Sequence, residues 1–400
     1  MNTKHLSPFQ QGIVGVQFLF VAFGATVLVP LLVGLNPSVA LFTAGVGTLL
    51  FHLVSKGKVP IYLGSSFAFI APIIESTRLY GLPGTLCGLA SVAAVYFLMS
   101  FLVKKRGIKL IERLFPPVVI GPVIILIGLS LAGTGVGMAK GNWILAISSL
   151  ATAVLVSLLA KGLWKLIPIF CGIIVGYTTA CIGGDVNLQS IVDAPWLSLP
   201  GFVTPQFSWQ AIIYMIPVAI APIIEHIGNI YTIGTVTGKD YVKDPGLERT
   251  LFGDGLACLF AGFVGGPPAT TYAEVTGAIS LTKISDPKII RITAVAAILF
   301  SVIGKISAFL QSIPSAVLGG IMLLLFGTIA CAGIQTMIRQ QTDLGQTRNM
   351  IIVSLTLTIG IGGAVLSWGT FSMSGIGLAA LMGMALNLLL PAERTLKEDA

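Results

Sequence analysis

The sequence predicts an all-α membrane protein that crosses the bilayer many times. Of its 400 residues, 55% are hydrophobic and only 10% are charged, whereas soluble domains carry about 25% charged residues. The mean hydropathy is +0.96. The 47 glycines and 21 prolines fall inside apolar stretches, which membrane helices tolerate better than soluble helices do. These observations exclude disordered, collagen-like and coiled-coil proteins.

Apolar stretches bounded by charged residues, proline or glycine define fourteen predicted spans. In chain order they cover residues 11–33, 38–55, 61–76, 82–103, 116–136, 142–160, 164–183, 208–231, 250–264, 268–282, 288–304, 313–334, 346–366 and 371–391. The first is longer than the apolar region of a signal peptide and lacks a small-residue cleavage site, so we expect it to be retained. Spans 61–76 and 268–282 are shorter than the roughly 20 residues of a full crossing. Each of these two is therefore expected to be a half-helix with a short β-strand break.

The distribution of basic residues supports this count, because one miscounted span would reverse the sidedness of every later loop. With the N-terminus in the cytoplasm, only Arg78, Lys140 and Lys305 of the 23 Lys and Arg fall in outside loops. The other basic residues fall on the cytoplasmic side. The sequence therefore predicts a multi-pass protein of the cell (inner) membrane with both termini cytoplasmic.

The two short spans are each the third member of a set of seven. Both contain prolines, then a polar Gly, Ser or Thr segment with an aromatic residue, then an apolar helical run. An odd number of spans per half inverts the second half relative to the first, as in secondary transporters whose interrupted helices form a substrate site at the midplane. We expect inverted repeats over 1–195 and 196–400, with the boundary near the polar stretch 195–207.

Two carboxylates lie deep within predicted spans. Glu225 is in the middle of span eight, and Glu274 is inside the interrupted span ten. A carboxylate at such depth is costly unless it is paired or lines a cavity; the alternative interpretation is a buried hydrogen bond that holds helices together. Glu75 and Asp254 lie near predicted span ends, where we expect solvated or helix-capping roles.

The chemistry of this site favours a nucleobase. The N-terminus of a half-helix offers backbone N–H groups, which suit carbonyl oxygens, whereas an ionised carboxylate only accepts hydrogen bonds. Uracil and xanthine present alternating N–H donors and C=O acceptors that satisfy both. A simple anion is disfavoured, because neither span eight nor span ten contains Lys or Arg and two acids would repel it.

Neighbouring polar residues are expected to support this site. Asn229 follows Glu225 by four residues, so both share one helix face, and Asn229 is expected to orient the carboxylate or the ligand. His226 points about 100° away from Glu225 and is expected to pack or to pair helices. Tyr272 and Ala273 are expected to supply backbone donors beside Glu274.

Other functional classes are disfavoured. An intramembrane enzyme would need a nucleophile–base pair or metal ligands at depth, and a passive channel would need rings of polar residues along a pore. The five cysteines are odd in number, lack CxxC spacing and lie in apolar segments, so we expect small core residues rather than disulfides or a zinc site. The net charge of +8 resides in loops, so it does not indicate a nucleic-acid partner. No cofactor or metal is expected.

Several stretches resemble the nucleobase–ascorbate transporter (nucleobase:cation symporter 2) family, and within it the bacterial uracil:proton symporters. The similarity covers nearly the whole chain. The characteristic stretches are FGATVLVPLLVGLNP (23–37), GTLLFHLVSKGKVPIYLGSSFAFIAP (47–72), ERLFPPVVIG (112–121), IIEHIGN (223–229), DPGLERTLFGDGL (244–256) and TTYAEVTGAISLTK (270–283). The last is similar to the family signature through Glu274, Gly277 and Thr282.

The resemblance implies a core domain from about 11–103 and 208–304 and a gate domain from about 116–183 and 313–391. It also implies a homodimer and an elevator-like alternating-access motion. The family's substrate-binding positions correspond here to Phe67, Glu225, Ala273, Glu274 and the span-twelve aromatic Phe326.

Three positions depart from the pattern of the uracil:proton symporters. Asn229 and Phe18, which follows Gln17, stand where those proteins have histidine, and Val275 stands where the signature has Asn. Glu225 is therefore the expected proton-binding group, with Gln17 and Asn229 supporting the site or the coupling. Proton-coupled import of uracil is the leading hypothesis; a purine permease for xanthine, urate or hypoxanthine, or coupling to Na⁺, is the alternative.

Overall fold

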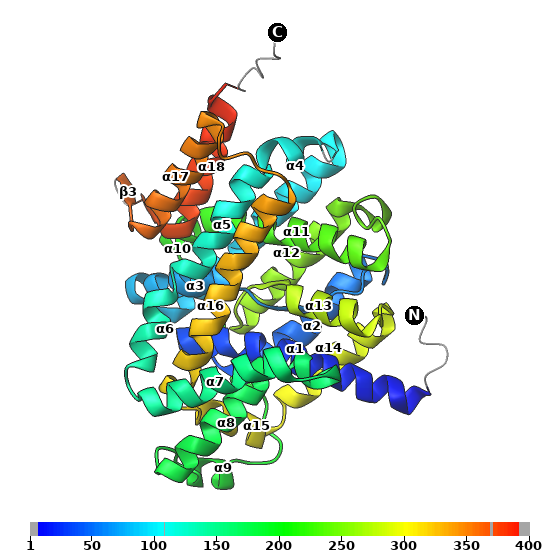
Figure 1. Cartoon of the computed structure of the whole chain (residues 1–400), viewed down its shortest axis with the longest axis vertical. Coiled ribbons are helices and arrows are strands. Elements are labelled where there is room, and N and C mark those ends of the chain that lie inside the picture. The colour runs from blue at the N-terminus through cyan, green and yellow to red at the C-terminus, as the bar shows by residue number, and fades with distance from the viewer. Residues whose placement is uncertain (1–6, 108, 369–370, 392–400) are drawn as a thin grey trace.

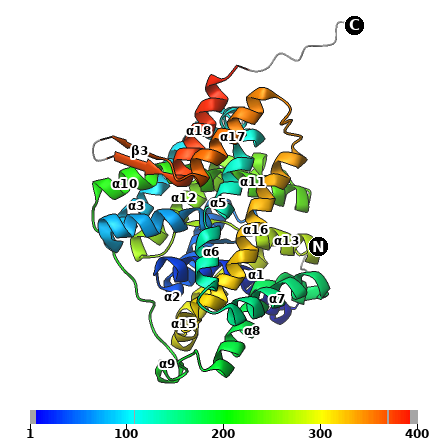
Figure 2. The same cartoon turned by 60° about the vertical axis from the view of Figure 1, so that its left-hand side comes forward.

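The computed structural model describes residues 7–107, 109–368 and 371–391, which are mostly helical (Figure 1). The first half contains α1 (Pro8–Val33), α2 (Pro37–Val54), β1 (Leu63–Ser65), the 3₁₀ turn η2 (Phe67–Phe69), α3 (Ile70–Arg106), α4 (Lys109–Leu114), α5 (Pro117–Leu129), α6 (Ala132–Ala139), α7 (Trp143–Leu159), η3 (Gly162–Leu166), α8 (Pro168–Gly183) and α9 (Gln189–Asp193). A long connection then runs along the outside of the molecule from α9 to α10 (Figure 2).

The second half is also mostly helical and contains three short strands. It contains α10 (Trp209–Met215), η4 (Ile216–Ala219), α11 (Ile220–Thr237), the π-helical turn η5 (Val242–Gly246), α12 (Leu247–Val264), β2 (Ala269–Thr271), α13 (Ala273–Thr282), α14 (Pro287–Ser301), α15 (Gly304–Gln311), α16 (Ser315–Arg339), α17 (Thr347–Ile361), β3 (Val365–Trp368), β4 (Phe371–Ser374) and α18 (Gly375–Leu389). Among the described residues, six helical segments are long and apolar enough to cross a membrane. The count of fourteen spans stays a prediction.

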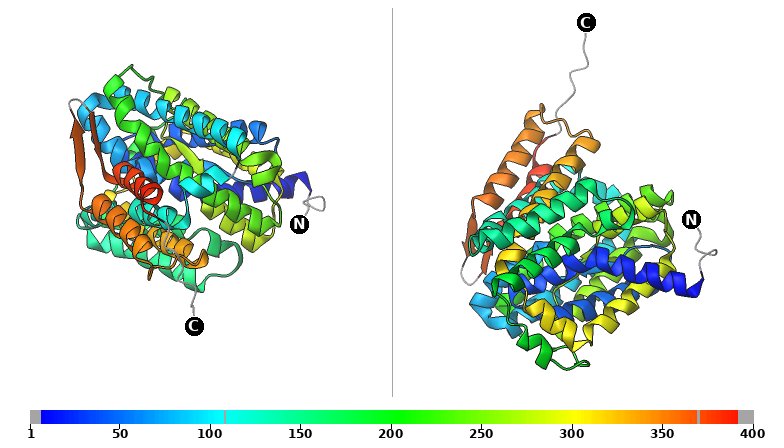
Figure 3. Two further views of the ribbon diagram at one scale, coloured as in Figure 1. Left: turned by 90° about the horizontal axis from the view of Figure 1, so that it is seen from above. Right: turned by 60° about the horizontal axis from the view of Figure 1, so that its bottom comes forward.

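The helices pack in two groups. In one, α12 packs on α2 and α3, and α14 packs on α1 and α2. In the other, α16 packs on α5, α6 and α7, while α17 packs on α5 and α18. Helix α16 runs along the length of the molecule, and α1 lies beside α14 (Figures 1 and 3). The two groups also contact each other. Helix α1 of the first group contacts α8, which packs on α7 of the second, and α11, which contacts α12 of the first group, also contacts α5 and α18 of the second.

A two-stranded antiparallel ribbon lies inside the first group. Strand β1 pairs with β2 in the register Leu63–Thr271 and Ser65–Ala269. Every residue of both strands is buried. Both stretches that the sequence identifies as interrupted therefore contain a strand followed directly by a helix, and the two strands meet although they are about half the chain apart.

Side chains from the surrounding helices satisfy the outer edges of this ribbon. The Thr48 hydroxyl of α2 accepts a hydrogen bond from the Leu63 N–H at 2.9 Å. The Cys258 thiol of α12 donates to the Ala269 carbonyl at 3.1 Å. These two contacts supply partners that a two-stranded ribbon in an apolar interior would otherwise lack. The Ser65 hydroxyl of β1 in turn donates to the Thr26 carbonyl of α1 at 2.9 Å and anchors the ribbon on that helix.

Two boundaries differ from the predicted spans. The predicted span 208–231 is broken by the 3₁₀ turn Ile216–Ala219, so α11, the helix that carries Glu225, begins only at Ile220. Pro217 lies in this turn and cannot donate to the preceding helical turn. Predicted spans three and four merge into α3, with a break in helical geometry at Gly81, whose φ is +71°.

The predicted junction between spans 346–366 and 371–391 is also different. Helix α17 ends at Ile361, and the chain continues as the antiparallel hairpin β3–β4. Gly363, just after α17, has φ +67°, a left-handed conformation that ends helices readily. Gly375, where β4 meets α18, has φ +62°. The hairpin lies at the edge of the molecule (Figures 2 and 3).

We expect Gly64→Ala to destabilise the ribbon. A Cβ at Gly64 would overlap the ring of Tyr272, whose hydroxyl donates to the Ser65 carbonyl at 3.0 Å and so cannot move aside easily. Overpacking a tight core typically costs about 1–3 kcal/mol. The melting temperature in detergent should fall, whereas Gly133→Ala in α6, where a Cβ meets no atom within 4 Å, should leave it unchanged. Equal melting temperatures for both variants would contradict this prediction.

Candidate functional site

Two helices begin at the ends of the buried ribbon. Phe67 opens the 3₁₀ turn that continues into α3, and Ala273 is the first residue of α13. Because β1 and β2 are antiparallel, these helices leave opposite ends of the ribbon and their N-termini approach it from opposite sides. The first N–H groups of a helix have no intrahelical partner and carry a partial positive charge. The arrangement therefore offers backbone donors within an apolar bundle.

The two predicted carboxylates accompany these donors. Glu274 is the second residue of α13, and Glu225 lies on α11, which packs on α13 and β2. Both side chains are half-buried, and they are close enough to interact electrostatically. The structure thus brings together two acceptors that the sequence separates by 49 positions.

Phe67 and Phe326 also come together. Their ring centroids are 6.2 Å apart with an interplanar angle of 86°, and both side chains are buried. Phe67 belongs to the first helix group, whereas Phe326 lies on α16 of the second. The aromatic pair therefore lies where the two groups meet.

Tyr272 and Asn229 have roles different from those expected. The Tyr272 N–H donates to the Tyr62 carbonyl at 3.0 Å, so the expectation of a free donor there is wrong. Asn229 donates from Nδ2 to the Thr271 carbonyl at 2.7 Å and to the Thr271 hydroxyl at 3.1 Å. Its amide group therefore holds strand β2 on α11 rather than orienting the Glu225 carboxylate. Ala273 is the site residue that is exposed.

Gln17 on α1 lies beside a cavity. Its side chain lines a cavity of about 270 Å³ between α1, η3 and the end of α13. The other lining residues are Val14, Phe18, Phe20, Val21, Trp164, Ile167, Thr282 and Ile284. Neither Glu225 nor Glu274 lines this cavity, and the supporting role of Gln17 stays a prediction.

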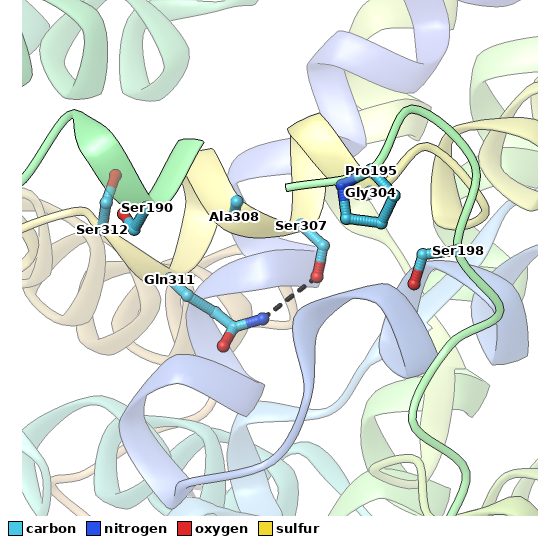
Figure 4. A pocket seen from close by; sticks show the side chains of 8 residues that line it. All are labelled: Ser190, Pro195, Ser198, Gly304, Ser307, Ala308, Gln311 and Ser312. Carbon is cyan, nitrogen blue, oxygen red and sulfur yellow. Dashed lines mark hydrogen bonds between the residues drawn. The ribbon is translucent and has the colours of Figure 1, made fainter. Parts of the chain in front are cut away.

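A second cavity of about 400 Å³ lies between α15 and the segment around α9 (Figure 4). It is lined by Ser190, Pro195, Ser198, Gly304, Ser307, Ala308, Gln311 and Ser312. Its polar side chains are largely bonded to one another or to nearby backbone; Gln311, for example, donates to Ser307 at 3.0 Å. This cavity contains none of the predicted site residues.

Sequence reasoning missed a buried pair behind the carboxylates. Asp254 is fully buried inside α12, and its Oδ2 lies 3.0 Å from Nδ1 of His226, so the expected solvated or capping role is wrong. The helix begins at Leu247 rather than at 250, which moves Asp254 into the helix interior. His226 does join two helices, as predicted. Glu75 is partly exposed and pairs with Arg78 at 2.6 Å, consistent with a solvated role.

The cysteines need a similar correction. All five are free, but only Cys258 is buried, while Cys331 is exposed. An exposed cysteine on an apolar helix such as α16 suits a surface that faces lipid rather than the protein core. Within the described residues, no cluster of three His, Cys, Asp or Glu side chains could hold a metal ion.

Carboxylates and helix N-termini at a strand ribbon inside an apolar helical bundle define a membrane transporter. Known structures share the fold. The chain superposes on SLC26A9 with a TM-score of 0.69 at 12% identity, covering 95% of this chain and 64% of that chain. It superposes on the transmembrane domain of the cyanobacterial bicarbonate transporter BicA with a TM-score of 0.66 at 12% identity, covering 96% and 98%.

Sequence comparison gives the family. The Permease family model Xan_ur_permease matches residues 9–368, so the chain belongs to this family of multi-pass membrane permeases and is not an enzyme. It is 50% identical over 391 residues to the probable uracil permease of Pasteurella multocida (strain Pm70), covering 96% of this chain and 94% of that protein. It is 44% identical over 399 residues to the uracil permease of Bacillus caldolyticus, covering 96% and 92%. The uracil permease of Escherichia coli (strain K12) is 40% identical over 384 residues, covering 93% and 89%.

Proposed function

We propose that the chain imports uracil together with protons. The observation that carries this proposal is the pairing of two carboxylate acceptors, Glu225 and Glu274, with helix N-termini at Phe67 and Ala273 around one buried ribbon. Uracil alternates C=O and N–H groups around its ring. Its carbonyls suit the backbone donors, its N–H groups suit the carboxylates, and its flat ring suits the aromatic pair of Phe67 and Phe326.

The names of the relatives support uracil rather than a purine. Proteins up to 50% identical over nearly the whole chain are called uracil permeases. The similarity to SLC26A9 and BicA, at 12% identity, concerns the fold alone. Spans eight and ten contain no Lys or Arg that could neutralise an anion.

The domains proposed for transport follow the two helix-packing groups. The core domain comprises about 11–103 and 208–304, and the gate domain about 116–183 and 313–391, within inverted repeats over 1–195 and 196–400. In an elevator-like cycle the core, with Glu225 and Glu274, moves against the gate, with Phe326. The proposed assembly is a homodimer, and Glu225 is the proposed proton-binding group.

Ligand-dependent stability tests the substrate. Purified protein should gain about 2.7 kcal/mol of unfolding free energy with uracil at a hundredfold excess over Kd, because only the folded state binds. Sulfate, bicarbonate and ascorbate should have little effect. Thermal denaturation in detergent measures this, and stabilisation by an inorganic anion without stabilisation by uracil would disprove the nucleobase site.

The proposed orientation is tested at the end of α3. Lys105 is exposed next to Lys104 and Arg106, and the excess of basic residues assigns this end to the cytoplasm. In a variant without the native cysteines, Lys105→Cys should react with an impermeant maleimide only in inside-out vesicles. A cysteine at the exposed Lys140 should react in intact cells. Labelling of Lys105→Cys in intact cells would refute the proposed sidedness.

A further inference from the structure

A buried acid–base pair lies behind the proposed site and takes no part in the function described so far. His226 on α11 and Asp254 on α12 have no exposed side-chain surface, and His226 Nδ1 lies 3.0 Å from Asp254 Oδ2. His226 directly follows Glu225 in the chain. The pair therefore links α11, which carries the proposed proton-binding residue Glu225, to α12.

The hydrogen bonds around His226 indicate where its protons are. The Thr250 hydroxyl lies 3.0 Å from the Leu247 carbonyl, to which it donates, as threonines within helices often do. The same hydroxyl oxygen lies 3.0 Å from Nε2 of His226. With its hydrogen already used, Thr250 accepts, so Nε2 carries a proton. Nδ1 then faces Asp254 either as the acceptor of a carboxylic O–H or as a second N–H of an imidazolium.

Besides His226, no side chain among the described residues that can become a cation acts on Asp254. The Tyr96 hydroxyl is also close enough to donate to the Asp254 carboxylate, but a phenol hydroxyl is not a counter-ion. The titratable groups around Asp254 are Tyr96 on α3, Cys258 on α12 and Glu225 on α11. The group that α2 presents to His226 is the ring of Phe51. An ionised carboxylate beside a neutral imidazole would therefore be a buried charge without a counter-ion, which is strongly unfavourable.

We propose that His226 and Asp254 retain one shared proton throughout the transport cycle and act as positioning residues for Glu225. Adjacent helix residues point about 100° apart, so fixing His226 on α12 directs Glu225 away from α12. This inference rests on the proposed function, in which the core moves and Glu225 exchanges the coupled proton. A pair that is neutral overall can cross the membrane with the core without carrying net charge.

Spectroscopy tests the retained proton directly. The chain has three histidines, so ¹⁵N-histidine spectra of wild type, His5→Gln and His52→Gln assign His226 by elimination without changing the pair. Infrared difference spectra of wild type minus Asp254→Asn report a protonated carboxyl group. We expect either an imidazolium at His226 or a carboxylic acid at Asp254 across the pH range of transport. A neutral imidazole together with an ionised carboxylate would overturn the proposal.

Transport measurements distinguish a proton that the pair retains from a proton that the pair exchanges during the cycle. Asp254→Asn can donate to Nδ1 of neutral His226, so we expect slower uptake with an unchanged pH profile and a wild-type Kd for uracil. A shifted pH profile would show that the pair exchanges its proton and would overturn the proposal. If uracil does not bind to the wild-type protein, the proposed substrate is wrong. The spectra still show in that case whether His226 and Asp254 retain the shared proton.

A double-mutant cycle of melting temperatures tests the proposal if Asp254→Asn does not fold. His226→Phe and Asp254→Leu each leave the partner buried without compensation, so each should lower the melting temperature. The double variant removes both polar groups and should melt above the less stable single variant, because contacting residues are not additive. A double variant that melts at the sum of the two decrements would contradict the shared proton.

Discussion

Glu274→Gln should strongly weaken uracil binding and uptake. Glu274 is the second residue of α13, beside the backbone N–H donors at the N-terminus of that helix. A uracil carbonyl bound to those donors would place the neighbouring uracil N–H near the Glu274 carboxylate. Glutamine retains the shape but can place an NH₂ group where uracil presents N–H. A buried donor left facing another donor costs about 1–3 kcal/mol, and more where a charge was involved. Kd should therefore rise by about tenfold to a hundredfold or more.

Glu75→Gln is the matched control for this variant. Glu75 is also an acid on a helix that starts at the ribbon, but it is partly exposed and pairs with Arg78. Its replacement should leave binding and uptake unchanged. Titration calorimetry with uracil measures both variants, and a Glu274→Gln protein that binds as tightly as wild type would remove Glu274 from the site.

The sequence predicts the interrupted segments because their prolines and polar residues stand out within apolar stretches. It cannot predict how the segments pair. The register of Leu63 with Thr271 is held by side chains from other helices, including Thr48, Asn229 and Cys258. Those contacts join positions 11 to 42 residues apart, and the strands that they hold come from opposite halves of the chain, so no local pattern encodes the pairing. For the same reason, Asn229 could be placed on the face of Glu225 but not assigned to strand β2.

The pair of His226 and Asp254 was missed because hydropathy alone does not locate the first residue of a helix that begins with charged residues. The segment before residue 250 contains several charged residues, so the apolar run begins too late and Asp254 is predicted near a span end. The structure extends α12 back to Leu247. One feature of the sequence does indicate the pair. Neighbouring predicted spans contain a base, His226, and an acid, Asp254, and intramembrane ionisable groups commonly pair with one another.

Glu225→Gln should keep uracil binding but lose uptake driven by a pH gradient. The amide oxygen still accepts a hydrogen bond, so glutamine mimics the protonated acid. It cannot bind or release a proton, so binding of uracil and movement of a proton are no longer linked. We expect a Kd near that of wild type, exchange of uracil between the two sides at equal pH, and no accumulation when the outside is acidic. Proteoliposomes with radiolabelled uracil, with and without a proton ionophore, measure all three.

Asn229→His tests the same assignment from the opposite direction. Its ring N–H can replace one donor to the Thr271 carbonyl that Asn229 now serves, and it adds a titratable group one helical turn from Glu225. In wild-type background this substitution should shift the pH profile of uptake, and combined with Glu225→Gln it should restore part of the pH-driven accumulation. Accumulation by Glu225→Gln alone, with the pH dependence of wild type, would show that Glu225 binds or supports the substrate and that another group carries the proton.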